Sequence, residues 1–197
     1  MLFENPINLN LKDADVVYYP NFFSRDIADS FFASLLNQIN WKQDKITVYG
    51  KTHLQPRLTA FYANNSSAYK YSTIIMHPNA FSGDLLKTKN AIETRLNINF
   101  TSCLANLYRD GLDSNGWHAD DEKELGKNPI IASVSFGAER LFHFKHKLDK
   151  TQKTKLILQH GSLLLMQGGT QTYWQHQIPK TRKTIGKRIN LTFRIIA

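Results

Sequence analysis

Residues 188–194 read Arg-Ile-Asn-Leu-Thr-Phe-Arg, and polar and apolar side chains alternate throughout. A period of two is typical of a β-strand, which we predict over Arg188–Ile196. Its polar face carries two arginines, about 20 Å apart at roughly 3.3 Å per residue, with an amide and a hydroxyl between them. An ordinary solvated face is one interpretation. Arginine is, however, suited to two-pronged recognition of carboxylates and phosphates, so the arginines are also candidates to bracket a small dianion. The polar-face residues are Arg188, Asn190, Thr192 and Arg194.

Further strand-like stretches lie upstream, rich in β-branched and aromatic residues and separated by Gly, Asn, Asp or Lys clusters. They are Phe100–Tyr108, Ile130–Phe136, Leu141–Lys145, Lys155–Gln159 and Ser162–Met166.

Two earlier stretches have helical periodicity instead. One follows a candidate N-cap at Ser24, and the other spans Ser82–Asn97. In the first, apolar residues recur every four positions, at Ile27, Phe31, Leu35 and Ile39. Helices followed by many short strands predict an α+β protein, in which the helices pack on an antiparallel sandwich or jelly roll.

A candidate metal site lies between these strands. His118 and Asp120 are two positions apart, so both project to the same side of an extended chain. Such a pair often arises by chance, so a third ligand must come from elsewhere, and His176 is the candidate. Two histidines and one carboxylate on one face form the facial triad of non-haem Fe(II) oxygenases. Zinc also accepts this set, but it gives the arginine-bearing strand no role.

Other polar residues have weaker signals. His143 and His146 are three positions apart, which places them on opposite faces of a strand, and Cys103 is expected in the core. For Arg140 the sequence leaves two alternatives: it faces the site, or it forms a surface salt bridge with its neighbour Glu139.

Length and composition predict one globular domain over residues 1–197. With 42% hydrophobic and 21% charged residues, the chain is unlike a disordered tail, a coiled coil or a collagen repeat. A single cysteine excludes an internal disulfide and a cysteine-rich zinc finger. No signal peptide or membrane span is visible, so we expect no membrane partner and no secretion. The net charge of +9 favours a polyanionic partner.

Five sequence blocks together resemble the AlkB family of iron- and 2-oxoglutarate-dependent nucleic-acid demethylases, most strongly its members that act on DNA. These blocks occur in the family's order and cover most of the chain from about residue 48 onward. They are Asn106–Gly111, Gly116–Glu122, Pro129–Ala138, His160–Leu164 and Arg188–Arg194.

The resemblance implies a double-stranded β-helix, with a catalytic jelly-roll core over 100–197. It implies Fe(II) held by His118, Asp120 and His176, with 2-oxoglutarate and O2 as cosubstrates. Arg188 and Arg194 resemble the family's two 2-oxoglutarate arginines. Other residues at positions that contact the cosubstrate are Asn106, Tyr108, Asn190 and Thr192.

The resemblance also implies a nucleotide-recognition lid at about 42–75. Tyr49 matches a finger that enters the base stack, although the resemblance favours Phe there. Tyr69 and Tyr71 are either lid aromatics or core-filling strand residues. A base methylated at a ring nitrogen is cationic, so aromatic faces and a carboxylate favour it over the neutral base. The expected substrate contacts are Tyr49, Arg57, Tyr69, Tyr71 and Glu122.

The implied activity is oxidative removal of N-methyl groups from bases such as 1-methyladenine and 3-methylcytosine, in DNA or RNA, and the sequence does not indicate which is preferred. The alternatives are a 2-oxoglutarate oxygenase acting on protein or lipid, and a catalytically silent nucleic-acid-binding module. We expect a monomer that is cytoplasmic in a bacterium or nuclear in a eukaryote.

Overall fold

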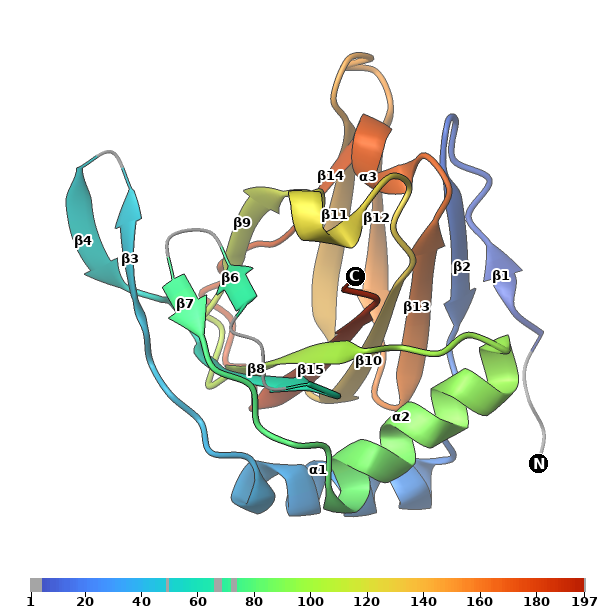
Figure 1. The fold of residues 1–197 in the computed structure, drawn as a ribbon. Coiled ribbons are helices and arrows are strands. Elements are labelled where there is room, and N and C mark those ends of the chain that lie inside the picture. The colour runs from blue at the N-terminus through green and yellow to red at the C-terminus, as the bar shows by residue number, and fades with distance from the viewer. Residues whose placement is uncertain (1–4, 49, 66–68, 72–73, 197) are drawn as a thin grey trace.

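The protein is described by a computed structural model that covers residues 5–48, 50–65, 69–71 and 74–196 (Figure 1). Within these ranges the strands form a seven-stranded major sheet, a four-stranded minor sheet and two separate hairpins. Neighbouring strands in both sheets pair antiparallel. This arrangement confirms the predicted jelly roll.

The major sheet has the order β1-β2-β13-β10-β15-β8-β5. In that order its strands are Ile7–Asn8, Asp15–Tyr19, Ser162–Gln167, Ile131–Gly137, Arg188–Arg194, Ser102–Tyr108 and Leu58–Ala63. The minor sheet has the order β12-β11-β14-β9. Its strands are Lys153–Leu158, Arg140–His146, Trp174–Ile178 and Asn115–His118.

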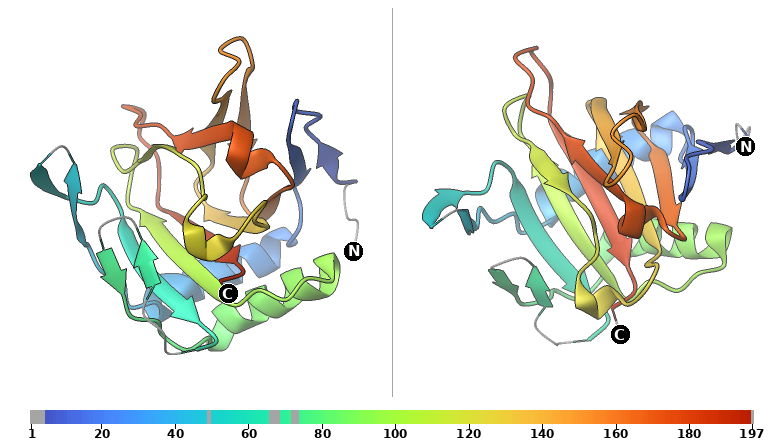
Figure 2. Two further views of the ribbon diagram at one scale, coloured as in Figure 1. Left: turned by 45° about the horizontal axis from the view of Figure 1, so that its top comes forward. Right: turned by 90° about the horizontal axis from the view of Figure 1, so that it is seen from above.

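Helices α1 (Arg25–Gln38) and α2 (Gly83–Leu96) cover the outer face of the major sheet, away from the minor sheet (Figures 1 and 2). Ser24 takes the N-cap position of α1, as the periodicity predicts, although its side chain makes no cap hydrogen bond. Ile27 is a correction: we expected it on the apolar face, but it is 41% exposed, because the buried side of the helix is centred on Ala28 and Leu35. Two short helical turns complete the described elements, η1 (Lys123–Leu125) and α3 (Thr170–Tyr173).

Two apolar clusters hold these layers together. The first lies between the helices and the major sheet and includes Ile189, Leu191 and Phe193 from the central strand β15. The second lies between the two sheets and includes Phe142, Phe144 and Trp174. Because alternate residues of β15 enter the first cluster, its polar residues must face the space between the sheets. The alternation predicted for residues 188–194 is therefore confirmed.

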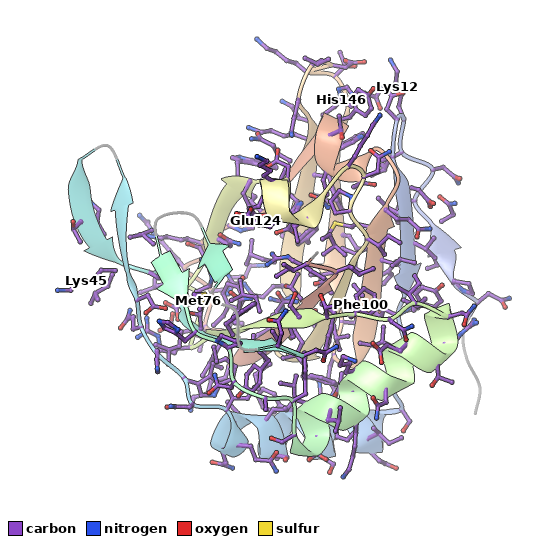
Figure 3. The ribbon with its side chains drawn as sticks, viewed as in Figure 1. Lys12, Lys45, Met76, Phe100, Glu124 and His146 are labelled. Carbon is purple, nitrogen blue, oxygen red and sulfur yellow. The ribbon has the colours of Figure 1, made fainter. Side chains whose placement is uncertain are left out.

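The six predicted strands are confirmed as β8, β10, β11, β12, β13 and β15, each within two residues of the expected bounds. Cys103 is fully buried, as expected. His146 is buried and His143 is not, which agrees with opposite faces of β11. At the end of the molecule where Figure 3 labels Lys12 and His146, the His146 Nε2 lies 3.4 Å from the Asp13 carboxylate.

The region expected to form a lid contains two hairpins, β3–β4 (Lys45–Val48 and Lys51–Leu54) and β6–β7 (Tyr69–Tyr71 and Ile74–Met76). The hairpin β3–β4 projects away from the two sheets (Figures 1 and 2). Between the hairpins, β5 joins the major sheet, so this region is anchored to the core at its centre. No helix in the part of the chain that the structure describes is long and apolar enough to cross a membrane.

Candidate active site

The three candidate metal ligands converge at one end of a cavity between the sheets. His118 ends β9, and His176 lies on β14 directly opposite it in the antiparallel ladder. Asp120 follows β9 by two residues. One ligand atom from each of these side chains lies within 4.8 Å of the others, close enough for a single ion to contact all three. The β9–β14 pairing thus brings together residues that are far apart in the sequence.

A backbone contact determines which nitrogen of His118 carries the hydrogen, whereas His176 Nδ1 has no hydrogen-bond partner among the described residues. His118 Nδ1 lies 2.8 Å from the Gly116 carbonyl oxygen, so this nitrogen donates its hydrogen and leaves Nε2 as the acceptor. His176 Nε2 lies 3.7 Å from Asp120 Oδ2. Burial lowers the pKa of His118. Burial, together with the neighbouring His118, lowers the pKa of His176 to about 3. Both rings are therefore neutral at pH 7, which metal coordination requires.

The Asp120 carboxylate is held in its ionised form. Burial alone raises the pKa of Asp120, but the Arg194 guanidinium outweighs that effect, and the pKa is lowered. Arg194 pairs with Oδ1, so Oδ2 faces His176. The backbone N–H of Asp120 donates to Gln171 Oε1 at 2.9 Å, a contact that the sequence did not suggest.

The other end of the cavity contains a buried arginine that forms no ion pair with any carboxylate among the described residues. Arg188 is 1% exposed, and its Nη2 donates to Ser135 Oγ at 2.9 Å. Its guanidinium carbon lies 5.2 Å from the centroid of the Tyr108 ring. Among the described residues, Arg188 Nε and Nη1 have no hydrogen-bond partner. Burial lowers the pKa of Arg188 to about 10, so the group remains charged at pH 7.

A buried cation with two unpartnered donors is unfavourable unless an anion completes it. All four polar residues of β15 line this cavity, together with Asn106 and Tyr108 of β8. Asn190 donates to Ser133 Oγ at 2.8 Å and accepts from Thr192 Oγ1. These hydrogen bonds fix the side chains of Asn190 and Thr192 between the two arginines. The cavity thus combines a cluster of metal-ligand type at one end with a buried, charged arginine at the other.

The residues expected to contact a substrate fall into three groups. Tyr49 lies outside the described residues. Tyr69 and Tyr71 lie on β6, of which only the backbone is described. The side chains of Arg57 and Glu122 are described, and both lie close to the metal-ligand cluster.

Arg57 is 4% exposed, and its Nε donates to Asn106 Oδ1 at 2.8 Å. Glu122 is partly buried, and its Oε2 has no partner among the described residues. Burial raises the pKa of Glu122, and the Asp120 carboxylate adds to this effect, while Arg194 opposes it.

Arg140 fits neither of the two alternatives that the sequence left open. It is 3% exposed and is bound to three backbone carbonyl oxygens. Nη1 donates to Asp110 at 3.1 Å, and Nη2 donates to Asp113 at 3.0 Å and to Pro179 at 2.7 Å. Arg140 therefore joins the loop before β9 to the segment after β14, and no local sequence signal reveals such long-range contacts.

Two imidazoles and one carboxylate on one face leave coordination positions of a metal open, as in the facial triad of non-haem iron oxygenases. A jelly roll with this cluster and a buried arginine strand defines the class of facial-triad oxygenases. The comparisons agree: the model of the 2OG-Fe(II) oxygenase superfamily matches residues 15–194.

Similar proteins of known name indicate which family within this class the chain belongs to. The alpha-ketoglutarate-dependent dioxygenase alkB homolog 3 of Bos taurus is 44% identical over 186 residues, which cover 90% of this chain and 64% of the relative. The DNA oxidative demethylase ALKBH2 of Mus musculus is 35% identical over 188 residues, covering 90% of this chain and 79% of the relative. The chain belongs to the AlkB family of 2OG-Fe(II) oxygenases. It spans 64–66% of the length of the mammalian alkB homolog 3 proteins that it matches.

Solved structures share the fold at low sequence identity. The structure of OsALKBH1 matches with a TM-score of 0.65 and 18% identity, over 97% of this chain and 100% of that chain. A prolyl hydroxylase from Trichoplax adhaerens matches with a TM-score of 0.64 and 10% identity, over 92% of this chain and 83% of that chain. These matches support the jelly-roll fold alone.

Proposed function

We propose that the protein is an Fe(II)- and 2-oxoglutarate-dependent dioxygenase that removes N-methyl groups from nucleic-acid bases, of the 1-methyladenine and 3-methylcytosine type. The names of relatives at 35–44% identity support the substrate class. The observation that carries the proposal is the cavity that joins the cluster of His118, Asp120 and His176 to the unpaired Arg188. One dianionic cosubstrate can contact both ends of this cavity.

The donor set fits iron and the 2-oxo acid. His118, Asp120 and His176 would hold Fe(II), which would supply the activation of O2 that converts 2-oxoglutarate to succinate and CO2, with the other oxygen atom incorporated into the methyl group of the base as a hydroxyl. The resulting N-hydroxymethyl group breaks its C–N bond, releases formaldehyde and leaves the unmodified base. The chain's own residues bind and orient the reactants, and none of them needs to act as an acid or a base.

The Arg188 end receives the distal carboxylate of the cosubstrate. Arg188 offers two unpartnered donors, Ser135 holds its third nitrogen, and Tyr108 lies against its face. Such charge-assisted hydrogen bonds are short and strong in a buried site. Asn190 and Thr192 brace the cavity wall between this end and Arg194.

Asn106 supplies a further contact, and Arg57 sets its orientation. Because Arg57 Nε donates to Asn106 Oδ1, the amide oxygen is already engaged. Nδ2 donates one hydrogen to the Leu104 carbonyl oxygen at 3.3 Å, and its second hydrogen can be donated to a carboxylate in the cavity. Arg57, expected as a substrate contact, is buried and engaged in this way. We therefore propose that Arg57 orients Asn106 for cosubstrate binding and does not contact the substrate.

The methylated base would enter beside Glu122. An N1-methylated adenine or N3-methylated cytosine is cationic, so it favours the ionised form of Glu122 even though burial raises the pKa of that carboxyl. We propose that residues 42–75 form the lid over the 100–197 core and that Tyr49, Tyr69 and Tyr71 supply its aromatic contacts. A methylated base pairs poorly, which lowers the free energy required to flip it out of the stack.

The test is a product assay. The purified protein is incubated with Fe(II), 2-oxoglutarate and O2, together with a 3-methylcytosine oligonucleotide, an unmethylated oligonucleotide or a proline-containing peptide, and formaldehyde and succinate are measured. We expect equimolar formaldehyde and succinate with the methylated oligonucleotide only. Turnover on the peptide alone would overturn the nucleic-acid substrate. No 2-oxoglutarate turnover with any substrate would favour a silent binding module. His160→Ala serves as a histidine control, because His160 lies beside α1, near the Phe32 ring.

A further inference from the structure

The three candidate metal ligands are not held in the same way. His118 and His176 lie on neighbouring strands and are fixed by the β9–β14 ladder. Asp120 lies beyond the end of β9, in a segment without regular secondary structure. A carboxylate on such a segment needs other contacts to keep its position relative to the two rings.

Gln171 provides one such contact from a distant part of the chain. It lies in α3, the short turn that joins β13 to β14, and is 1% exposed. Its Oε1 accepts the Asp120 backbone N–H at 2.9 Å, while its Nε2 is 3.7 Å from Met166 Sδ. Sulfur is a weak acceptor, so the hydrogen bond to Asp120 is the strong interaction of this buried amide.

Lys147 forms a second connection between the same two segments. Its Nζ donates to the Gln171 carbonyl oxygen at 2.8 Å and to Asp121 Oδ2 at 3.0 Å. Its own backbone N–H donates to the Tyr173 carbonyl oxygen at 2.7 Å. Asp120 is therefore attached to α3 through its backbone N–H, and Asp121 is attached to α3 through its side chain and Lys147.

These contacts act on a different part of Asp120 from the arginine. Arg194 binds Oδ1 of the side chain, whereas Gln171 binds the backbone N–H. With its backbone N–H bound to Gln171 and its Oδ1 bound to Arg194, Asp120 directs its Oδ2 toward His176. Partners that orient a metal ligand contribute to metal affinity, because the ligand does not have to be ordered when the metal binds.

We infer that Gln171 is a positioning residue for the metal site: it holds the Asp120 carboxylate in its ligating position through the backbone, and Lys147 reinforces the contact. The inference rests on the proposed function, since it requires that His118, Asp120 and His176 bind the metal. The alternative is that the contact merely packs α3 against the protein. That role would change stability without changing metal affinity.

The experiment measures Mn(II) binding to the full chain by calorimetry, without cosubstrate or substrate. The variants are Gln171→Leu, which removes the acceptor, and Gln171→Glu, which retains one. Gln175→Leu is the matched control, because Gln175 lies beside His176 but pairs with Lys145 of β11 on the outer face. Thermal unfolding of each metal-free protein reports its stability separately.

We expect Gln171→Leu to raise the Kd for Mn(II) by roughly tenfold or more. Gln171→Glu and Gln175→Leu should bind about as tightly as the unmodified chain. Lys147→Met leaves the interior intact and should weaken binding in the same direction by a smaller factor, so it tests the inference even if Gln171→Leu does not fold.

Two outcomes separate the inference from the function on which it rests. If His118→Ala weakens Mn(II) binding but Gln171→Leu and Lys147→Met do not, the metal site stands and the positioning role of Gln171 is wrong. If the unmodified chain and His118→Ala bind Mn(II) equally, the proposed metal site itself is wrong, and the inference falls with it.

Discussion

The two arginines of β15 lie on one face of one strand, yet the two ends of the cavity surround them differently. Arg194, at the metal end, is paired with Asp120. Arg188, at the anion end, has no ion-pair partner among the described carboxylates, and two of its donors lack a described acceptor. The charge of Arg194 is thus balanced within the chain, and we propose that an anion balances the charge of Arg188.

The two ends are also constructed differently. At the anion end, Arg188 pairs in register with Tyr108 of β8 and Gly137 of β10, so the ladders of the central sheet fix its place. At the metal end, Asp120 depends on side-chain contacts from α3 and β15. We therefore expect substitutions near the metal end to act through ligand position. Those at the anion end should act through lost binding of the cosubstrate.

The largest expected effect is that of His118→Ala at the metal end. Removing one of three ligands should abolish turnover while oligonucleotide affinity stays close to that of the unmodified chain, because the base contacts that we propose involve other residues. Formaldehyde release and fluorescence anisotropy with a labelled oligonucleotide measure the two properties. If oligonucleotide binding were lost as well, His118 would have a role beyond the metal.

Arg188→Met tests the anion end. Loss of charge-assisted hydrogen bonds of about 1.5–3 kcal/mol should raise the KM for 2-oxoglutarate roughly 10- to 100-fold, with Mn(II) affinity unchanged. Arg194→Met is the matched comparison, and it should weaken both properties because Arg194 also holds Asp120. Identical profiles for the two variants would contradict the division of the cavity into two ends.

Arg57→Met should produce a smaller effect at the wall between the ends. Without the Arg57 contact, the Asn106 amide is free to turn, and the loss of about 1 kcal/mol raises the KM for 2-oxoglutarate roughly fivefold. Steady-state kinetics would measure this change, with Arg95→Met on the remote helix α2 as the control. An unchanged KM for 2-oxoglutarate combined with weaker oligonucleotide binding would show instead that Arg57 contacts the nucleic-acid substrate.

The smallest expected effect concerns the loop that connects the two ends, between Tyr108 on β8 and His118 on β9. Burial alone raises the pKa of Asp113, but the hydrogen bonds from Arg109 outweigh it, and the pKa is lowered. A carboxyl with a lowered pKa contributes stability above its unfolded pKa of about 3.9, and that contribution is lost as the pH falls through the folded pKa.

Asp113→Asn should therefore lower the free energy of unfolding by about 1.5 kcal/mol at pH 7, and the deficit should shrink below roughly pH 4. Urea unfolding across this pH range measures the difference between the two proteins. A deficit that does not change with pH would contradict the ion-pair origin of the effect.

The sequence predicted the parts of the site that follow local rules. The alternation of residues 188–194 identified the cavity-facing side of β15, because a period of two does not depend on distant contacts. The strands β2, β5, β9 and β14 were not predicted. Five of the six residues of β5 are buried, on both faces, so the strand shows no alternation, and β9 has only four residues.

What the sequence could not predict are the contacts between distant segments. Gln171 is one polar residue in a short turn, and nothing nearby indicates that it reaches Asp120. For Arg140, likewise, the sequence indicated only the adjacent Glu139 as a partner. In the structure, Arg140 donates to three backbone carbonyl oxygens from segments that are distant in the sequence. Tyr49, Tyr69 and Tyr71 remain predictions.

The central claim is that one cavity holds a metal at His118, Asp120 and His176 and a cosubstrate carboxylate at Arg188. The most direct measurement is a crystal structure with Mn(II) and N-oxalylglycine, an unreactive analogue of 2-oxoglutarate, recorded with anomalous scattering. We predict one strong anomalous peak among the three ligand side chains and the distal carboxylate of the analogue on Arg188. A metal peak elsewhere, or a distal carboxylate away from Arg188, would contradict the claim.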